Sequence, residues 1–177
     1  MEYTITQTNQ QAIIDLFTAT FSDSEGEAEG KAIGGLVEDL LTNTDLDDLM
    51  VYTASEEGQL VAAILLTRLT FDCDVNAFLL APVAVSTASQ GKGVGQGLIN
   101  HALKALRGQE VELVFTYGDP RFYSKVGFEQ VTQQQYPAPL PLSYPHGWLA
   151  QSLTQQPLDA IGGQSHCVAA FNKPEFW

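Results

Sequence analysis

The sequence predicts a mixed α/β fold in one domain, on three observations. The chain has 177 residues, 45% of them hydrophobic, which is enough for one core and leaves little for a second. Apolar residues recur at helical spacing in some segments and as strand-length runs in others, in a mixed order along the chain. The sequence shows no internal repeat and no linker long enough to separate domains. We therefore expect one domain over residues 1–177.

The N-terminal part is predicted to hold a strand and two helices. A short strand is expected near residues 3–7, and Asn9 can then cap the first helix. That helix presents one apolar face, formed by Ile13, Leu16, Phe17 and Phe21. The second helix shows the same spacing at Ala32, Ile33, Leu36, Val37, Leu40 and Leu41.

Strands dominate the next part of the chain. Residues 49–54 and 60–70 flank Glu56-Glu57-Gly58, a sequence typical of a hairpin turn. Residues 75–85 form the following strand, which leads into a glycine-rich turn.

The C-terminal part is predicted to alternate strands with irregular structure. Residues 111–115 form a strand, and Asp119 and Pro120 can begin a short helix as its cap and first residue. The four prolines of residues 137–145 exclude a central strand, so this segment should be an exposed loop or one that covers the active site. Residues 148–153 and 166–171 are expected to be closing strands.

The most informative segment is residues 79–106, where an apolar strand runs into the glycine turn and then an amphipathic helix. Glycine at positions 91, 93, 95 and 97 lets successive backbone N–H groups converge on one ligand at the helix N-terminus. The helix has an apolar face formed by Leu98, Ile99, Ala102, Leu103 and Leu106. We expect phosphate oxygens as the ligand, since each charge-assisted hydrogen bond contributes about 1.5 to 3 kcal/mol.

The spacing of its glycines distinguishes this turn from two familiar phosphate-binding loops. The G-x-G-x-x-G fingerprint fails because a residue other than glycine stands at its last position in either register. The Walker loop fails because no Ser or Thr follows Lys92. The pattern that fits is Q-x-x-G-x-G, at Gln90, Gly93 and Gly95.

This segment resembles the central motif of the GCN5-related N-acetyltransferase (GNAT) superfamily. That motif reads [QR]-x-x-G-x-[GA] between a strand and a helix, and it binds the pyrophosphate of acetyl-coenzyme A. Downstream, Tyr123, Gly127 and Phe128 match the family's Y-x-x-x-G-F ending. Residues 118–123 read G-D-P-R-F-Y, which is similar to the YhbS-like branch. The resemblance covers residues 79–131 by motif and the rest by pattern only.

The resemblance implies a fold and an activity. The fold is a central, mostly antiparallel sheet of about six or seven strands flanked by about four helices, with a splayed strand pair that holds the coenzyme. The activity is that of an N-acetyltransferase with acetyl-coenzyme A as co-substrate. The acetyl group passes directly to a primary amine in a ternary complex, without an acyl-enzyme.

The resemblance also assigns roles to positions in this chain. The strand backbone that holds the pantetheine arm is that of Val83, Ala84 and Val85. The turn amides that hold the pyrophosphate are those of Gln90, Gly91, Lys92, Gly93, Val94, Gly95 and Gln96. Tyr123 is the catalytic candidate, as the acid that protonates the departing thiolate, because a pKa near 10 keeps tyrosine protonated at neutral pH. Conceivable bases for the amine are Glu25, Glu27, Glu29, Asp72 and Asp74, and no spacing selects among them.

Plainer interpretations stand beside these roles. A glycine-rich turn can be a simple tight connection, and a tyrosine such as Tyr123 can be a half-buried core residue. The alternative function is a noncatalytic acyl-coenzyme A binding or sensing module, which would keep the turn and catalyse nothing. Tyr123 favours the enzyme over this alternative.

The negative charge lies mostly at the N-terminus. Residues 1–60 hold 13 acids against one base, Lys31, which leaves only −1 of the net −13 for the remaining residues. In the family this region lines the acceptor side, where acidic residues would attract a cationic amine acceptor, either a small molecule or a protein. The alternative is a solvated surface without a binding role. The charge disfavours nucleic acid as a partner.

The remaining features bear on location and cofactors. The N-terminus lacks a basic segment followed by an apolar stretch, and no apolar run is long enough to span a membrane, which predicts a cytoplasmic protein without membrane partners. Cys73, Cys167 and the histidines lack the spacing of metal ligands, so no metal is expected. Homodimers are common in the family, which leaves a homodimer as an open expectation.

Overall fold

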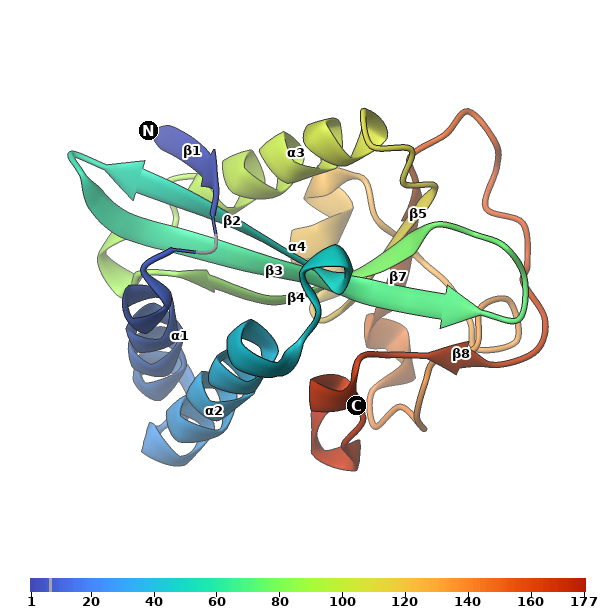
Figure 1. Ribbon diagram of the computed structural model, residues 1–177, viewed down its shortest axis with the longest axis horizontal. Coiled ribbons are helices and arrows are strands. Elements are labelled where there is room, and N and C mark those ends of the chain that lie inside the picture. Colours follow the sequence, from blue (N-terminus) through green and yellow to red (C-terminus); the bar gives the residue numbers. More distant parts are fainter. Residues whose placement is uncertain (7) are drawn as a thin grey trace. The chain divides into compact units, whose positions relative to one another are not determined.

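The chain combines helices and strands in a mixed α/β fold (Figure 1). The computed structural model describes residues 1–6 and 8–177, so Gln7, the last residue of the predicted first strand, lies outside the described residues. The helices are α1 (Gln10–Glu25), α2 (Glu27–Asn43), α3 (Val94–Arg107) and α4 (Pro120–Tyr123). The strands are β1 (Glu2–Ile5), β2 (Leu49–Glu56), β3 (Gln59–Phe71), β4 (Ala77–Val85), β5 (Leu113–Tyr117), β6 (Glu129–Gln130), β7 (Trp148–Ser152) and β8 (Ser165–His166).

The strand order is β1-β2-β3-β4-β5-β7-β6, and β8 pairs with β3 outside this order. The pairs β1–β2, β5–β7, β6–β7 and β3–β8 are antiparallel, whereas β4 and β5 are parallel. The prediction of a mostly antiparallel sheet is therefore confirmed. The described residues form eight strands, which is one more than the upper value of the six or seven expected.

The described chain forms two compact units, each made of two stretches of sequence. The first contains Met1–Leu66 and Pro82–Ala102, and the second contains Thr67–Ala81 and Leu103–Trp177. Strands β3 and β4 and helix α3 run from one unit into the other. We describe each unit by itself.

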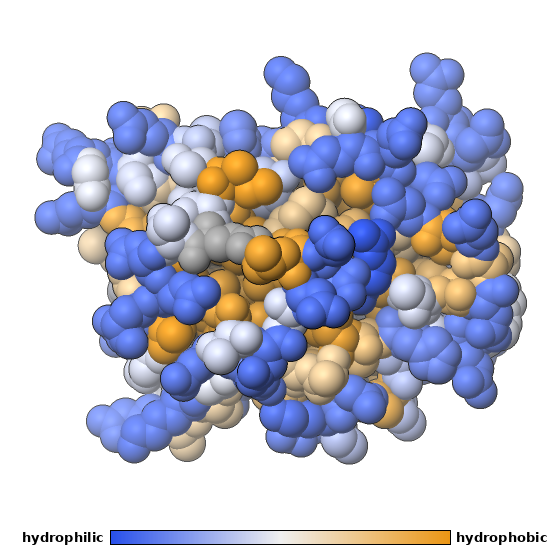
Figure 2. All heavy atoms as spheres, in the orientation of Figure 1, coloured by the Kyte–Doolittle hydropathy of each residue, from blue (hydrophilic) through white to orange (hydrophobic). Residues whose placement is uncertain are grey.

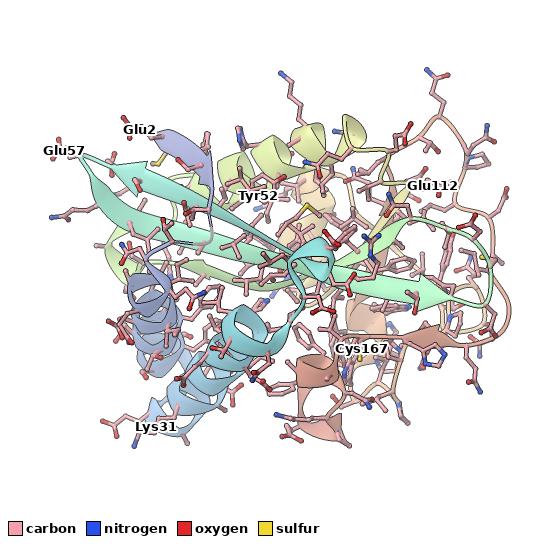
Figure 3. The ribbon with its side chains drawn as sticks, viewed as in Figure 1. Glu2, Lys31, Tyr52, Glu57, Glu112 and Cys167 are labelled. Carbon is pink, nitrogen blue, oxygen red and sulfur yellow. The ribbon has the colours of Figure 1, made fainter. Side chains whose placement is uncertain are left out.

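The first unit contains the predicted hairpin and the two N-terminal helices. The hairpin turn between β2 and β3 has Glu57 at φ 51° and Gly58 at φ 76°, the two positive values that a tight hairpin requires. Glu57 lies at the tip (Figure 3). β1 pairs along β2, with Tyr3 opposite Ala54.

Helices α1 and α2 lie side by side (Figure 1), and small residues permit their close approach. A Cβ on Gly30 of α2 would lie 2.6 Å from the Thr18 carbonyl oxygen of α1 and would also meet the Ser22 side chain. A Cβ on Gly34 would meet the Thr18 hydroxyl. Gly35, one residue further along α2, has nothing within 4 Å of that position.

This packing predicts opposite effects for two identical substitutions in α2. Gly30→Ala is expected to lower the free energy of unfolding by about 1 to 3 kcal/mol, because the new methyl group overpacks against backbone. Gly35→Ala is expected to raise it by about 0.5 to 1 kcal/mol, since alanine is the better helix former and meets no neighbour. Urea unfolding of both variants measures the difference. Stabilisation by both substitutions would contradict the close contact at Gly30.

The second unit has an aromatic core centred on β5. The Phe115 ring lies 5.2 Å from Trp148, 5.2 Å from Tyr136 and 5.4 Å from Phe71. The C-terminal Trp177 is buried, and its indole N–H donates to the Phe171 carbonyl at 2.8 Å. The C-terminal aromatic residues therefore cover the core of this unit.

The proline-rich segment, residues 137–145, and the residues that follow it are hydrogen-bonded to the end of β5. The Tyr117 hydroxyl accepts a hydrogen bond from the Tyr144 amide at 2.7 Å, and the Gly118 amide donates to the Gly147 carbonyl at 3.0 Å. No strand or α-helix forms over residues 137–144, as the prolines predicted, and Tyr144 is 51% exposed.

Two local predictions were wrong, and one short strand was not predicted. Asn9 precedes α1 with φ 58° and makes no capping hydrogen bond, so its side chain does not cap the helix. The predicted strand at 166–171 ends at His166, because residues 169–171 turn into a 3-10 helix that carries Phe171 into the aromatic core. Strand β6 was not predicted, since a two-residue strand has no periodicity of its own.

None of the helices in the described ranges has the length and apolar character of a membrane span.

Candidate functional site

The glycine turn between β4 and α3, in the first unit, has the backbone of an anion cradle. Gly91 and Gly93 have φ values of 72° and 77°, with Lys92 between them. The alternation turns successive amides toward one side of the chain. In the described part of the chain, the six amides from Gly91 to Gln96 donate to no protein acceptor. The first α3 hydrogen bond beyond them runs from the Gly97 amide to the Gly93 carbonyl at 2.9 Å.

These six amides can hold an anion for two physical reasons. Unpaired N–H groups at the N-terminus of a helix are strong donors, and the α3 dipole places partial positive charge there. Space is also available, since nothing lies within 4 Å of where a Cβ would stand on Gly91 or Gly93. Lys92 is exposed and leaves the turn open.

Gln90 donates hydrogen bonds to other residues of the protein from both its backbone amide and its side-chain amide. Its side-chain amide donates to the Val85 carbonyl at 3.0 Å, and its backbone amide donates to the Thr87 carbonyl at 3.4 Å. The side-chain donor thus reaches the end of β4 and the backbone donor reaches the 3-10 helix Thr87–Ser89, in contrast to the residues that follow Gln90.

β4 and β5 pair over a short distance only. Within the described residues their ladder joins Ala77–Leu79 with Leu113–Phe115, while β4 continues to Val85 and β5 to Tyr117. One position beyond the ladder, the buried Thr116 hydroxyl donates to the Leu80 carbonyl at 2.8 Å. Pro82 has no amide hydrogen to continue a ladder.

The predicted pantetheine-binding residues occupy the end of β4 beyond that ladder. Ala84 is buried, whereas Val83 and Val85 are half-buried. The Val85 carbonyl is occupied by Gln90 and by the Thr20 hydroxyl of α1 at 3.5 Å.

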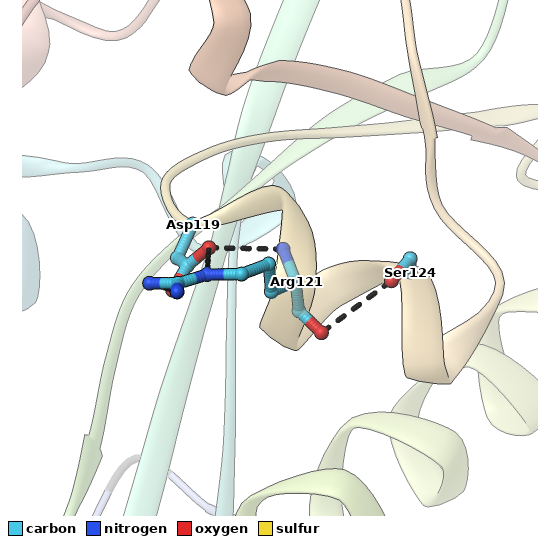
Figure 4. A network of polar contacts seen from close by, with 3 residues as sticks. All are labelled: Asp119, Arg121 and Ser124. Atoms are coloured by element: carbon cyan, nitrogen blue, oxygen red, sulfur yellow. Dashed lines mark hydrogen bonds and ion pairs between the residues drawn. The ribbon is translucent and has the colours of Figure 1, made fainter.

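The second unit holds Tyr123 at the end of α4, a helix whose start was predicted. Asp119 caps it by accepting from the Arg121 amide at 2.9 Å, and Pro120 is its first residue (Figure 4). The Arg121 guanidinium also donates to Asp119, at 3.2 Å. These hydrogen bonds hold the pKa of Asp119 below its usual range, so this carboxylate is a structural cap.

Tyr123 is buried and held on several sides. Its ring centroid lies 5.0 Å from that of Phe122 and 5.7 Å from that of Phe128. A Cβ on Gly118 would lie 2.8 Å from the Tyr123 ring, so only glycine leaves room for this ring position. Burial raises the pKa of Tyr123 above the ordinary value of 10.0, and a hydrogen bond with the Thr116 side chain offsets part of the increase. A neutral phenol that keeps its proton can act as a general acid.

Two residues beside the predicted sites were not found by sequence reasoning. Thr116 carries no motif, and its role depends on a strand pairing that local sequence does not show. Gly118 was visible as part of the G-D-P sequence, but its contact with Tyr123 was not. Among the candidate bases, Asp72 accepts from the Gln164 amide at 2.8 Å, and Glu25 and Glu27 are exposed. The described residues contain no group of three His, Cys, Asp or Glu arranged to hold a metal ion.

The turn, the helix behind it and the strands around them lie in a part of the chain that matches a known protein family. Residues 47–130 match the Acetyltransferase (GNAT) domain family. The chain is 36% identical over 147 residues to the uncharacterized N-acetyltransferase YjhQ of Escherichia coli K12, covering 77% of this chain and 81% of YjhQ. The chain belongs to the GNAT family of N-acetyltransferases.

Solved structures share the fold. The GNAT-family N-acetyltransferase YhbS of Escherichia coli, in complex with CoA, superimposes with a TM-score of 0.76 at 22% identity, covering 97% of this chain and 92% of YhbS. A GNAT-family acetyltransferase from Brucella melitensis, in complex with acetyl-CoA, gives a TM-score of 0.72 at 23% identity over 96% of this chain and 98% of that one. An aminoglycoside 6'-N-acetyltransferase complexed with coenzyme A gives 0.64 at 15% identity, covering 89% of this chain and 99% of that one.

Proposed function

We propose that this protein transfers the acetyl group of acetyl-coenzyme A directly to a primary amine. The observation that carries the proposal is the row of six amides from Gly91 to Gln96, which have no protein acceptor in the described residues and precede helix α3. The family, and the coenzyme in solved structures of this fold, supply the ligand that fits them. Pyrophosphate oxygens accept from these amides and fix the coenzyme.

The chemistry is a single displacement. The neutral amine nitrogen attacks the thioester carbonyl carbon, an N–C bond forms and the C–S bond breaks, and the nitrogen releases one proton to solvent as the amide forms. Tyr123 gives its proton to the departing thiolate, and its raised pKa keeps that proton in place until the thiolate needs it. The amine must first lose a proton, which for a pKa of about 10.4 costs roughly 4.6 kcal/mol at neutral pH.

Calorimetric titration of acetyl-coenzyme A tests the donor half of the proposal, followed by thiol release in the presence of primary amines. Micromolar binding with amine-dependent thiol release is the expected result. Binding without release by any amine would favour the noncatalytic acyl-coenzyme A module. Absence of binding would reduce the turn to a structural connection and overturn the proposal.

We propose further that the acceptor is a cationic amine. The first 60 residues carry 13 acids, and hydrophilic side chains cover much of α1 and α2 on the face seen in Figure 2. Lys31, the single base of this region, extends outward from α2 (Figure 3). Members of this fold include an aminoglycoside acetyltransferase, whose substrate class carries several amines.

Salt dependence distinguishes a cationic acceptor from an acidic surface without a binding role. Raising the ionic strength from about 0.01 M to about 0.15 M shortens the Debye length from about 30 Å to about 8 Å, so kcat/KM for a polyamine acceptor should fall severalfold. An amine with no second charge serves as the control and should change less. Equal salt dependence for both amines would contradict steering by the acidic region.

A further inference from the structure

One backbone carbonyl joins the end of β4, helix α1 and the glycine turn. The Val85 carbonyl accepts from the Gln90 side-chain amide at 3.0 Å and from the Thr20 hydroxyl at 3.5 Å. The next residue, Ser86, donates its amide to the Val61 carbonyl of β3 at 2.8 Å. The end of β4, to which Gln90 donates, is therefore also hydrogen-bonded to α1 and to β3 of the first unit.

The other side of the connection is also tied to α1. The Thr87 hydroxyl donates to the Asp23 carboxylate at 2.6 Å, and the Ser89 amide donates to the Ser86 carbonyl at 2.8 Å. Residues 86–90 are thus fixed at both ends. Gly91 has no such tie, and the row of free amides begins there.

The Gln90 side chain donates a hydrogen bond back to the end of β4, on the N-terminal side of that row. One of the two Nε2 hydrogens is donated to the Val85 carbonyl, and the positive φ values that shape the cradle occur afterwards, at Gly91 and Gly93. A turn built on two glycines in this conformation has many alternative backbone states in the absence of a tether. A tether immediately before the turn reduces the entropy that is lost when an anion orders the amides.

We infer that Gln90 is a positioning residue for the coenzyme, whose side chain presets the amides of residues 91–96 without touching the ligand. This inference rests on the proposed coenzyme binding. It gives Gln90 a different role from its neighbours, since they donate to the pyrophosphate and Gln90 donates to Val85.

The test compares Gln90→Met, which keeps the length of the side chain and removes its donor, with Gln59→Met at an exposed position of β3. Gln90→Met should weaken binding of acetyl-coenzyme A about three- to tenfold in calorimetry, the effect of one hydrogen bond. With S-acetylpantetheine, which lacks the pyrophosphate, Gln90→Met should lower kcat/KM by a smaller factor than with acetyl-coenzyme A. Gln59→Met should behave as wild type with both donors.

A second readout separates positioning from direct contact. In amide NMR spectra of the ligand-free protein, Gln90→Met should shift the Gly91, Gly93 and Gly95 signals, and Gln90→Arg, which restores N–H donors, should return them toward wild type. Unchanged affinity in Gln90→Met would overturn the inference. Weaker affinity with unmoved signals would also overturn it, because the side chain would then contact the coenzyme itself. Failure of the wild-type protein to bind acetyl-coenzyme A would instead refute the proposed function, and the inference with it.

Discussion

Tyr123→Phe is expected to lower the turnover number by about 100- to 10,000-fold while acetyl-coenzyme A binds as before. The substitution removes only the hydroxyl, and the ring keeps its contacts with Phe122, Phe128 and Gly118. The loss corresponds to a general acid that protonates the thiolate in the transition state. Steady-state thiol release measures turnover, and calorimetry measures binding.

Tyr136→Phe is the matched control. Tyr136 is a fully buried tyrosine of the same unit, and its hydroxyl has no hydrogen-bond partner among the described residues. Its removal should leave turnover unchanged. Equal losses in both variants would indicate damage to the aromatic core, and unchanged turnover in Tyr123→Phe would remove Tyr123 from the mechanism.

The pH profile gives an independent check on Tyr123. A general acid works while it holds its proton, so activity falls as the pH rises through its pKa. Because burial raises that pKa above 10.0, the alkaline limb assigned to Tyr123 should lie above this value. The limb should disappear in the residual activity of Tyr123→Phe. An alkaline limb well below the ordinary tyrosine value would belong to another group.

Gly93→Ala is expected to weaken binding of acetyl-coenzyme A by about 10- to 100-fold or more. Gly93 has φ 77°, which costs an alanine about 1 to 2 kcal/mol. Relaxing that strain rotates the neighbouring peptides and removes one or two charge-assisted hydrogen bonds, each contributing about 1.5 to 3 kcal/mol. The added methyl group also enters the space that the anion would occupy. Calorimetric titration measures the loss.

Gly58→Ala is the matched control, because Gly58 has a similar backbone conformation and lies outside the cradle. Gly58 belongs to the same unit, has φ 76° and, like Gly93, has nothing within 4 Å of its Cβ position. Both variants should therefore lose similar stability in urea unfolding, whereas only Gly93→Ala should lose affinity for the coenzyme. Similar affinities in the two variants would show that the turn does not bind the pyrophosphate.

Much of the fold and the candidate site was predictable because the signals are local. The apolar face of α3, the hairpin at Glu57-Gly58 and the Asp119 cap each depend on residues a few positions apart. The Q-x-x-G-x-G spacing likewise located the row of free amides, since glycine conformation and the start of a helix are properties of consecutive residues.

The amino-acid sequence by itself determined the order of the elements, the position of the glycine turn and the family to which the motifs point. Only the tertiary structure decided that Gln90 reaches back to Val85, that Gly118 makes room for Tyr123 and that residues 169–171 turn away from β8 toward the aromatic core. The physical reason is that these outcomes depend on which atoms fill a given space after the strands have paired. Residue spacing along one segment carries no information about which atoms fill that space, whereas packing and hydrogen-bond geometry decide it.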